Sequence, residues 1–188
     1  MKIGLFFGSF NPVHIGHLII AEFVANNTDV DQVWLVVSPQ NPLKPSNSLL
    51  NEYDRLHLVN LAIGDNKLLR SSDVEFKLPK PSYTIDTLTY LQEKYPTNEF
   101  SIIMGSDSYQ NLSNWKNHEL IRKNYRIIVY ERPQFPCDPK EERTVCLKAP
   151  LLEISATQIR NLVKEGKSVR YLLPDAIVSE IIDNQYFK

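Results

Sequence analysis

The chain has 188 residues and a mass of 21.7 kDa, enough for one α/β domain with a buried core. Its 43% hydrophobic and 23% charged residues are typical of a globular protein. The formal net charge of −1 excludes an overall basic field for nucleic acid or an acidic membrane, so an anionic partner needs a local site.

Short apolar runs alternate with helical patterns along the whole chain. Six runs are predicted to be strands: residues 3–7, 32–38, 68–75, 100–104, 125–130 and 144–148. Six segments are predicted to be helices: 15–27, 51–65, 84–95, 112–123, 156–165 and 175–184. This alternation predicts a doubly wound parallel sheet with helices on both faces. We expect a single domain over residues 1–188, with a helical C-terminal portion from about residue 155.

Neither a targeting segment nor a functional cysteine motif is expected from the sequence. The apolar run at the N-terminus ends at Gly8, too early for a signal peptide, and no later run approaches the length of a membrane span. Cys137 and Cys146 form no CxxC or zinc pattern. We expect both to be free thiols in a reducing cytoplasm.

The first predicted strand leads into "GSFNPVHIGH", which holds two of the four histidines. Gly8 lets the backbone approach a ligand closely, and the next helix begins near His14. His14 and His17 lie on one face of its first turn, beside the free N–H groups of the helix start. The pattern favours a phosphate site, although two capping or surface histidines are the simpler alternative. The hypothesis of a metal site has less support, because no third ligand is evident.

A second helix start follows the last predicted strand, in "EISATQIR". Ser155 and Gln158 have the spacing of a capping box, so a plain helix cap is one interpretation. Thr157 and Arg160 share a face of the same turn, which adds a hydroxyl and a guanidinium suited to phosphate oxygens. The nearby "GKS" lacks the earlier glycine of a P-loop and is interpreted as a helix-ending glycine at position 166.

Both segments resemble motifs of one superfamily. "GSFNPVHIGH" is similar to the G-x-F-D-P-x-H-x-G-H signature of the Rossmann-like nucleotidyltransferases, with Asn11 in place of the usual Asp. The His-x-G-His part also occurs in class I aminoacyl-tRNA synthetases, but their Lys-rich second signature is absent here. "ISATQIR" resembles the I-S-S-T-x-I-R motif of the superfamily, with Ala156 replacing the second serine.

The middle of the chain narrows the resemblance. "SYTIDTL", "IMGSDSYQNLSNW", "YERP" and "YLLPDAI" come in that order. With the two end motifs, they resemble bacterial nicotinate-mononucleotide adenylyltransferases over essentially the full length. In "QNPLKP", where the family often has Pro-Pro-His-Lys, Lys44 is the remaining cation.

This resemblance implies roles for particular residues. Catalysis is assigned to His14, His17 and Arg160. ATP binding is assigned to Gly8, Ser9, Phe10, Gly105, Asp107, Arg132, Ile154, Ser155 and Thr157. Nicotinate mononucleotide binding is assigned to Lys44, Tyr83, Thr84 and Trp115, with Thr84 as a helix N-cap and Trp115 stacked on the pyridine ring. His57 and His118 are assigned to structure or surface.

The implied reaction is attack of the mononucleotide phosphate on the α-phosphorus of ATP, giving nicotinate adenine dinucleotide and pyrophosphate in NAD biosynthesis. It needs no protein nucleophile. Mg²⁺ would arrive with the ATP phosphates, so no all-protein metal site is expected. The partners are ATP and nicotinate mononucleotide, without nucleic acid or membrane. Phosphopantetheine adenylyltransferase, a cytidylyltransferase and a nucleotide-sensing module that has lost turnover remain alternatives.

Overall fold

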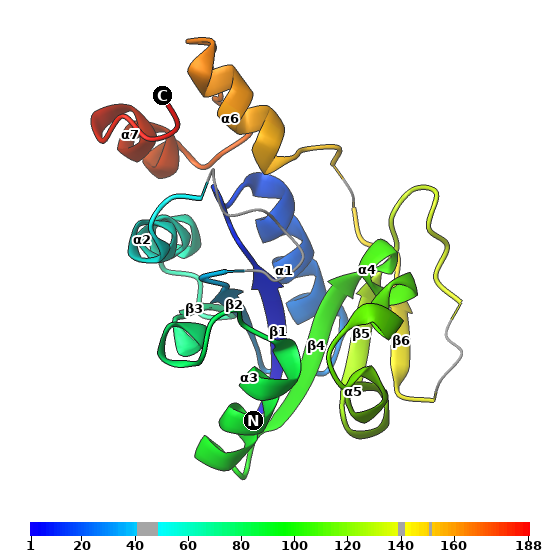
Figure 1. Cartoon of the computed structure of the whole chain (residues 1–188). Helices are drawn as coiled ribbons and strands as arrows, with labels where there is room; N and C mark the ends of the chain where they lie inside the picture. Colours follow the sequence, from blue (N-terminus) through cyan, green and yellow to red (C-terminus); the bar gives the residue numbers. More distant parts are fainter. Residues whose placement is uncertain (41–48, 139–141, 151) are drawn as a thin grey trace.

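The centre of the molecule is a six-stranded parallel sheet, seen in a computed structural model that describes residues 1–40, 49–138, 142–150 and 152–188 (Figure 1). Its strands are β1 (Lys2–Gly8), β2 (Gln32–Val37), β3 (Leu69–Ser72), β4 (Glu99–Gly105), β5 (Arg126–Tyr130) and β6 (Thr144–Leu147). The order is β3-β2-β1-β4-β5-β6, and every pair is parallel. The predicted doubly wound sheet is confirmed, and its order reverses between β1 and β4.

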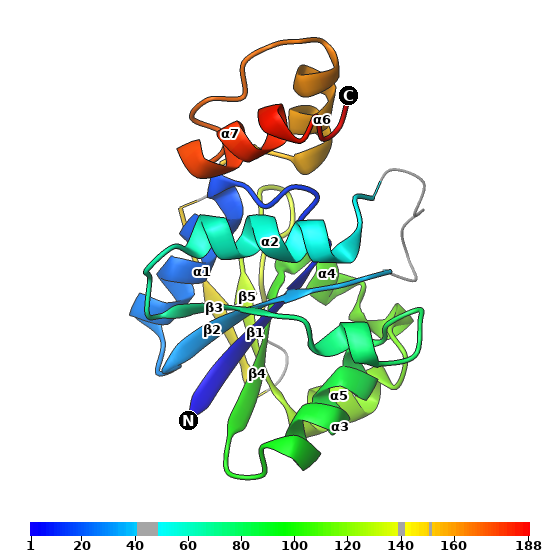
Figure 2. The same cartoon turned by 90° about the vertical axis from the view of Figure 1, so that its left-hand side faces the viewer.

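The helices lie on both faces of this sheet and beyond its carboxyl edge. They are α1 (Ile15–Asn27), α2 (Glu52–Ile63), α3 (Thr84–Lys94), α4 (Ser106–Gln110), α5 (His118–Asn124), α6 (Ala156–Lys164) and α7 (Asp175–Asp183), with 3-10 turns η1 (Val74–Lys77) and η2 (Leu112–Asn114). Figures 1 and 2 show α6 and α7 together past the carboxyl ends of the strands. No helix in the described ranges is long and apolar enough to cross a membrane.

Two hydrophobic clusters sandwich the sheet because successive strand side chains point to opposite faces. Along β2, Leu35 belongs to the cluster under α1 and α2, whereas Trp34 belongs to the cluster under α3 and α5. Ile159 and Ile177 bring α6 and α7 into the first cluster. The C-terminal helices are therefore packed against the same core as α1.

Two predicted elements were wrong in part. The strand predicted over 68–75 ends at Ser72, because the Phe76 N–H bonds to the Asp73 carbonyl at 2.9 Å and starts η1. The helix predicted over 112–123 is interrupted, since Asn117 adopts a left-handed conformation with φ of 52°. Trp115 consequently lies between η2 and α5 rather than inside a helix.

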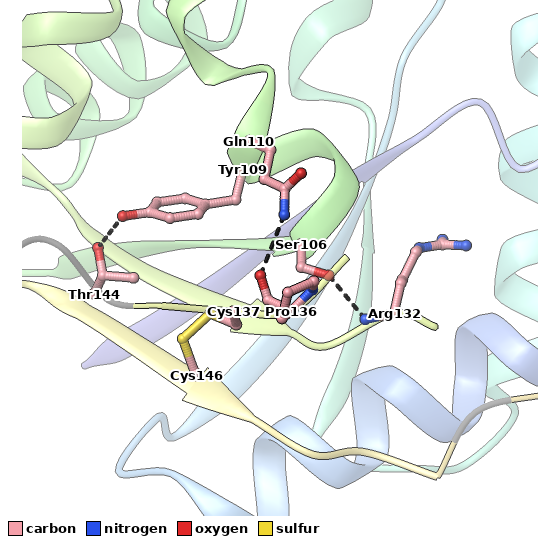
Figure 3. Close-up of a disulfide and its surroundings, with 8 residues drawn as sticks. All are labelled: Ser106, Tyr109, Gln110, Arg132, Pro136, Cys137, Thr144 and Cys146. Atoms are coloured by element: carbon pink, nitrogen blue, oxygen red, sulfur yellow. Dashed lines mark hydrogen bonds between the residues drawn. A yellow bond between two sulfur atoms is a disulfide. The ribbon is translucent and has the colours of Figure 1, made fainter. Parts of the chain in front are cut away.

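The prediction of two free thiols was also wrong. Cys137 and Cys146 form a disulfide, with their Cα atoms 6.0 Å apart, inside the range that a disulfide spans (Figure 3). Cys137 lies in the loop after β5 and Cys146 lies in β6. The Gln110 side chain donates to the Pro136 carbonyl, next to Cys137, at 3.2 Å. The bond ties the loop that follows Arg132 to the edge of the sheet.

A fully buried arginine on α2 fastens the loops that follow β1 and β2. The Arg55 guanidinium donates to the carbonyls of Ser9 at 2.6 Å, Ser38 at 2.7 Å and Pro39 at 3.2 Å. A fourth bond reaches the Leu50 carbonyl at 3.0 Å. One cation thus satisfies carbonyls from two loops that would otherwise be buried without donors.

We predict that Arg55→Met lowers the free energy of unfolding by about 3 kcal/mol, because several buried carbonyls lose a charged donor at once. Urea denaturation measures this. The control is Arg143→Met, which removes an exposed arginine with one bond to the Asn124 carbonyl and should change stability by less than about 0.5 kcal/mol. Equal unfolding midpoints for Arg55→Met and the wild type would show that the hydrogen bonds of Arg55 do not stabilise the fold.

Candidate active site

A cavity of about 790 Å³ lies at the carboxyl ends of β1 and β4. This is the point where the strand order reverses, and ligands of doubly wound proteins bind there. The cavity brings together predicted site residues from four separate segments: Gly8, Ser9, Tyr83, Thr84, Gly105, Asp107 and Trp115. The cavity is also lined by four residues that were not predicted from the sequence: Ser38, Glu75, Ser82 and Lys116. Lys44 falls outside the described residues.

The loop after β1 is shaped by Phe10, which has a positive φ of 45° and is only 2% exposed. Its ring packs edge-on against His17, with centroids 5.1 Å apart. A Cβ on Gly8 would lie 2.8 Å from this ring. Glycine at position 8 is therefore required by the side chain of Phe10, and Phe10 itself can offer a ligand little beyond its backbone.

The two histidines are held as a stacked pair at the start of α1. Their ring centroids lie 3.6 Å apart, and the His14 backbone N–H donates to His17 Nδ1 at 3.2 Å. Because Nδ1 accepts this bond, a neutral His17 carries its proton on Nε2, as a donor. Burial, with a smaller contribution from the Arg132 charge, lowers the pKa of His14 to about 4. His14 is thus neutral near pH 7.

Helix α6 reaches the histidine loop through Arg160. Its Nη1 donates to the Asn11 carbonyl at 2.8 Å and its Nη2 to Thr157 Oγ1 at 3.2 Å. The predicted cap is present, since Ser155 Oγ accepts the Gln158 N–H at 3.2 Å. The two phosphate-type motifs, far apart in the sequence, therefore meet. Ile154 is half-buried against the core and contributes packing at this junction.

The departure at Asn11 leaves this junction intact. Arg160 uses the backbone carbonyl of Asn11, while the Asn11 side-chain oxygen accepts the Leu50 N–H at 3.1 Å. A carboxylate oxygen could accept the same bond, so Asn and Asp are equivalent in this contact.

Gly105 at the end of β4, Asp107 of α4 and Arg132 after β5 pack tightly together on the other side of the cavity. A Cβ on Gly105 would overlap the Asp107 carboxylate and lie 2.7 Å from Arg132 Nε. Asp107 Oδ1 pairs with Arg132 Nε at 3.2 Å, and Arg132 also donates to the Tyr130 hydroxyl at 3.0 Å. Its backbone N–H bonds to Ser106 Oγ at 2.8 Å (Figure 3). Arg132 is thereby fixed against the end of β4 and the start of α4.

The third wall of the cavity is the start of α3. The N-cap is Tyr83 and not Thr84 as predicted, and Thr84 is the first helical residue, with no side-chain cap bond. The shift arises because Tyr83 has extended backbone angles while its carbonyl accepts the Asp86 and Thr87 N–H groups. Lys116 bonds to Asp86 at 2.8 Å and lies over the Tyr83 ring, 4.8 Å from its centroid.

The remaining histidines have contacts of other kinds. His57 is exposed and pairs with Glu180 of α7 at 3.2 Å, while His118 begins α5. No group of three or more His, Cys, Asp or Glu side chains in the described ranges could hold a metal ion.

Comparison with known proteins defines the class first. Residues 5–162 match the cytidylyltransferase-like family model, so the chain belongs to the cytidylyltransferase-like proteins. A probable nicotinate-nucleotide adenylyltransferase of Cytophaga hutchinsonii is 54% identical, covering 100% of this chain and 98% of its own. One of Flavobacterium psychrophilum is 50% identical, with 100% of both chains covered. Within its class, the chain belongs to the nicotinate-nucleotide adenylyltransferase family.

The fold agrees with solved structures. The Plasmodium falciparum nicotinic acid mononucleotide adenylyltransferase complexed with NaAD superimposes with a TM-score of 0.85 at 19% identity. The match covers 99% of this chain and 97% of that chain. At this identity the likeness concerns the fold alone.

The low pKa of His14 predicts how stability depends on pH. Because the folded-state pKa lies below the ordinary 6.5, protonation opposes folding, so the stabilisation is complete above about pH 6.5 and lost as the pH falls towards 4. We expect the unfolding free energy of the wild type to fall relative to His14→Gln by on the order of 3 kcal/mol across this window. Urea titrations at several pH values measure the difference, and parallel profiles would disprove the shift.

Proposed function

We propose that the protein transfers the adenylyl group of ATP to nicotinate mononucleotide, giving nicotinate adenine dinucleotide and pyrophosphate in NAD biosynthesis. The observation that carries this proposal is the cavity at the switch point, bordered by the loop before the histidines at one side and by Tyr83, Thr84 and Trp115 at the other. The names of the relatives point to the same reaction. With ATP as a substrate, we expect the enzyme to act in the cytoplasm.

In this mechanism an oxygen of the mononucleotide phosphate attacks the α-phosphorus of ATP. The new P–O bond forms as the bond to the β-phosphate oxygen breaks, and pyrophosphate leaves with that electron pair. No protein nucleophile takes part, so catalysis consists of alignment and charge stabilisation. In the proposed mechanism His17 donates from Nε2 to this charge, and the neutral His14 lies stacked beside it.

Arginines neutralise the remaining negative charge in the proposed transition state. Arg160 reaches the histidine loop from α6, and Arg132 is near enough to His14 to depress its pKa. Mg²⁺ enters as part of the Mg·ATP substrate, with phosphate oxygens and water as its main ligands. The ion would offset the charge of the leaving pyrophosphate.

The other reactions of the class are less well supported. Phosphopantetheine adenylyltransferase and the cytidylyltransferases share the first motif. Their substrates, however, do not explain the "SYTIDTL" segment or Trp115. A nucleotide-sensing module would bind ATP without turnover. Release of pyrophosphate on mixing the protein with Mg·ATP and nicotinate mononucleotide distinguishes these possibilities.

The proposed role of His17 predicts that His17→Ala lowers kcat by about 10²–10³ with a much smaller change in ATP affinity, because the lost donor faces developing charge. Steady-state kinetics and ATP titration measure the two effects. His57→Ala, which removes an exposed histidine paired with Glu180, is the control and should keep the wild-type kcat. A kcat close to wild type in His17→Ala would remove this histidine from catalysis.

For Arg160→Lys we expect the KM for ATP to rise about tenfold in a stably folded protein. An ammonium cannot bond to the Asn11 carbonyl and Thr157 and still present a planar pair of donors to phosphate. Lys164→Arg, on the exposed side of the same helix, should leave KM unchanged. Wild-type kinetics in Arg160→Lys would place the guanidinium outside the site.

We also predict a preference for nicotinate over nicotinamide mononucleotide. The first amides of α3 are donors at a positive helix end, and they favour an acceptor-only carboxylate. A carboxamide would turn its NH₂ toward at least one of them, at a cost of roughly 1–3 kcal/mol, or about fivefold to 150-fold. The ratio of kcat/KM for the two mononucleotides measures this, and a ratio of one or below would refute it.

A further inference from the structure

A buried acid lies at the α3 end of the cavity, and the mechanism above gives it no role. Glu75 of η1 is 2% exposed, yet it lines the cavity together with Ser82 and Tyr83. Ser82, which is 8% exposed, directly precedes the N-cap of α3. An ionisable side chain this deep in a substrate cavity is a candidate for a functional role.

The hydrogen bonds of this acid are incomplete. Glu75 Oε1 accepts the Thr87 hydroxyl at 2.9 Å, which ties η1 to the first turn of α3. Its second oxygen, Oε2, and the hydroxyl of Ser82 are buried, and neither completes a hydrogen bond of normal geometry with the described residues. The hydroxyl nevertheless lies near enough to the carboxyl to favour its ionised form. Two such atoms beside each other at a cavity wall indicate polar groups that a ligand can satisfy.

The electrostatic surroundings of Glu75 are mostly neutral. Burial raises the pKa of its carboxyl, while the hydroxyls of Ser38, Thr87 and Ser82 oppose this to a smaller extent. The charged groups of the neighbouring segments have other partners: Arg55 bonds to the Ser38 carbonyl, and Lys116 pairs with Asp86. On its own segment, Asp73 and Lys77 are exposed.

We propose that Glu75 determines specificity for the ring substituent of the mononucleotide, accepting a carboxylate when Glu75 is neutral and disfavouring it when Glu75 is ionised. Neutral Glu75 donates from Oε2 to the carboxylate, directly or through water. Ionised Glu75 adds a like charge in a poorly solvated cavity, and instead accepts a bond from a carboxamide NH₂. This inference rests on the proposed function and names the residue that tunes its selectivity.

The test is the ratio of kcat/KM for nicotinate and nicotinamide mononucleotides, measured at saturating Mg·ATP from about pH 5, just above the ordinary pKa of a glutamate, to about pH 9. Titration of ATP, of the shared phosphate and of the histidines affects both substrates alike and largely cancels in the ratio. For the wild type we expect the ratio to fall by about tenfold as the pH rises. A flat wild-type ratio in an active enzyme would overturn the role of Glu75 alone.

Variants separate this role from a structural one. Glu75→Gln has nearly the same shape and cannot ionise, so it should retain activity with a ratio independent of pH. Glu93→Gln, an exposed acid at the far end of α3, should behave as the wild type. Ser82→Ala removes a hydroxyl that favours the ionised form, so it should move the fall of the ratio to higher pH.

Three further outcomes would count against the proposal. The first is a kcat/KM ratio that still falls with pH in Glu75→Gln as it does in the wild type. The second is a Ser82→Ala protein whose ratio depends on pH as in the wild type. The second outcome also overturns the proposal if Glu75→Gln does not fold. The third is a wild type that releases no pyrophosphate with either mononucleotide, which would overturn the proposed function and this inference together.

Discussion

The guanidinium of Arg55 is the contact around which the cavity is organised. Its four carbonyl acceptors lie in the loop after β1, in the loop after β2 and just before α2. A buried cation without acceptors and buried carbonyls without donors both cost free energy. The Arg55 side chain lies between the two loops and removes both costs, which allows the loops to be buried side by side. The carbonyls of Ser9 and Ser38 are thereby fixed at one wall of the cavity.

The same loop is fixed from a second direction by the C-terminal part of the chain. Arg160 of α6 binds the Asn11 carbonyl, and the Ile15 N–H bonds to the Leu172 carbonyl at 3.1 Å. The histidine pair is thus held between α2 on one side and the segment from α6 to α7 on the other. Such support is what a site requires when catalysis depends on alignment, because small displacements of the donors weaken transition-state contacts.

Much of the fold could be predicted because its strands and helices have clear hydrophobic periodicity and begin and end at residues typical of such boundaries. The strands alternate between two apolar clusters, and the helix starts carry caps such as Ser155. The break near Trp115 could not be predicted, because no glycine or proline interrupts residues 112–123, and the left-handed conformation falls on an asparagine. The disulfide was missed because the nine-residue separation of its cysteines says nothing of how the loop folds back.

The candidate site could be predicted where a local motif marks it, as at the two helix starts that Arg160 brings together. It could not be predicted where partners come from distant segments. Arg55 looks like the polar face of an amphipathic helix, and its acceptors at Ser9 and Ser38 are 46 and 17 residues away. Glu75 looks like the end of a strand, and its burial depends on how η1 packs against α3.

Buried polar atoms without hydrogen bonds lower the stability of the fold near the cavity, and a bound ligand could supply those bonds. Five buried side-chain polar atoms in the described part of the chain lack a hydrogen bond, and four of them belong to His14, Glu75, Ser82 and Asp107. Of these, only Asp107 has the compensation of an ion pair, with Arg132. Each remaining atom costs about 1–3 kcal/mol unless water or a ligand completes its bonds. A ligand that supplies those bonds recovers this free energy on binding, so the residues that destabilise the empty fold are also the ones to which we assign ligand binding.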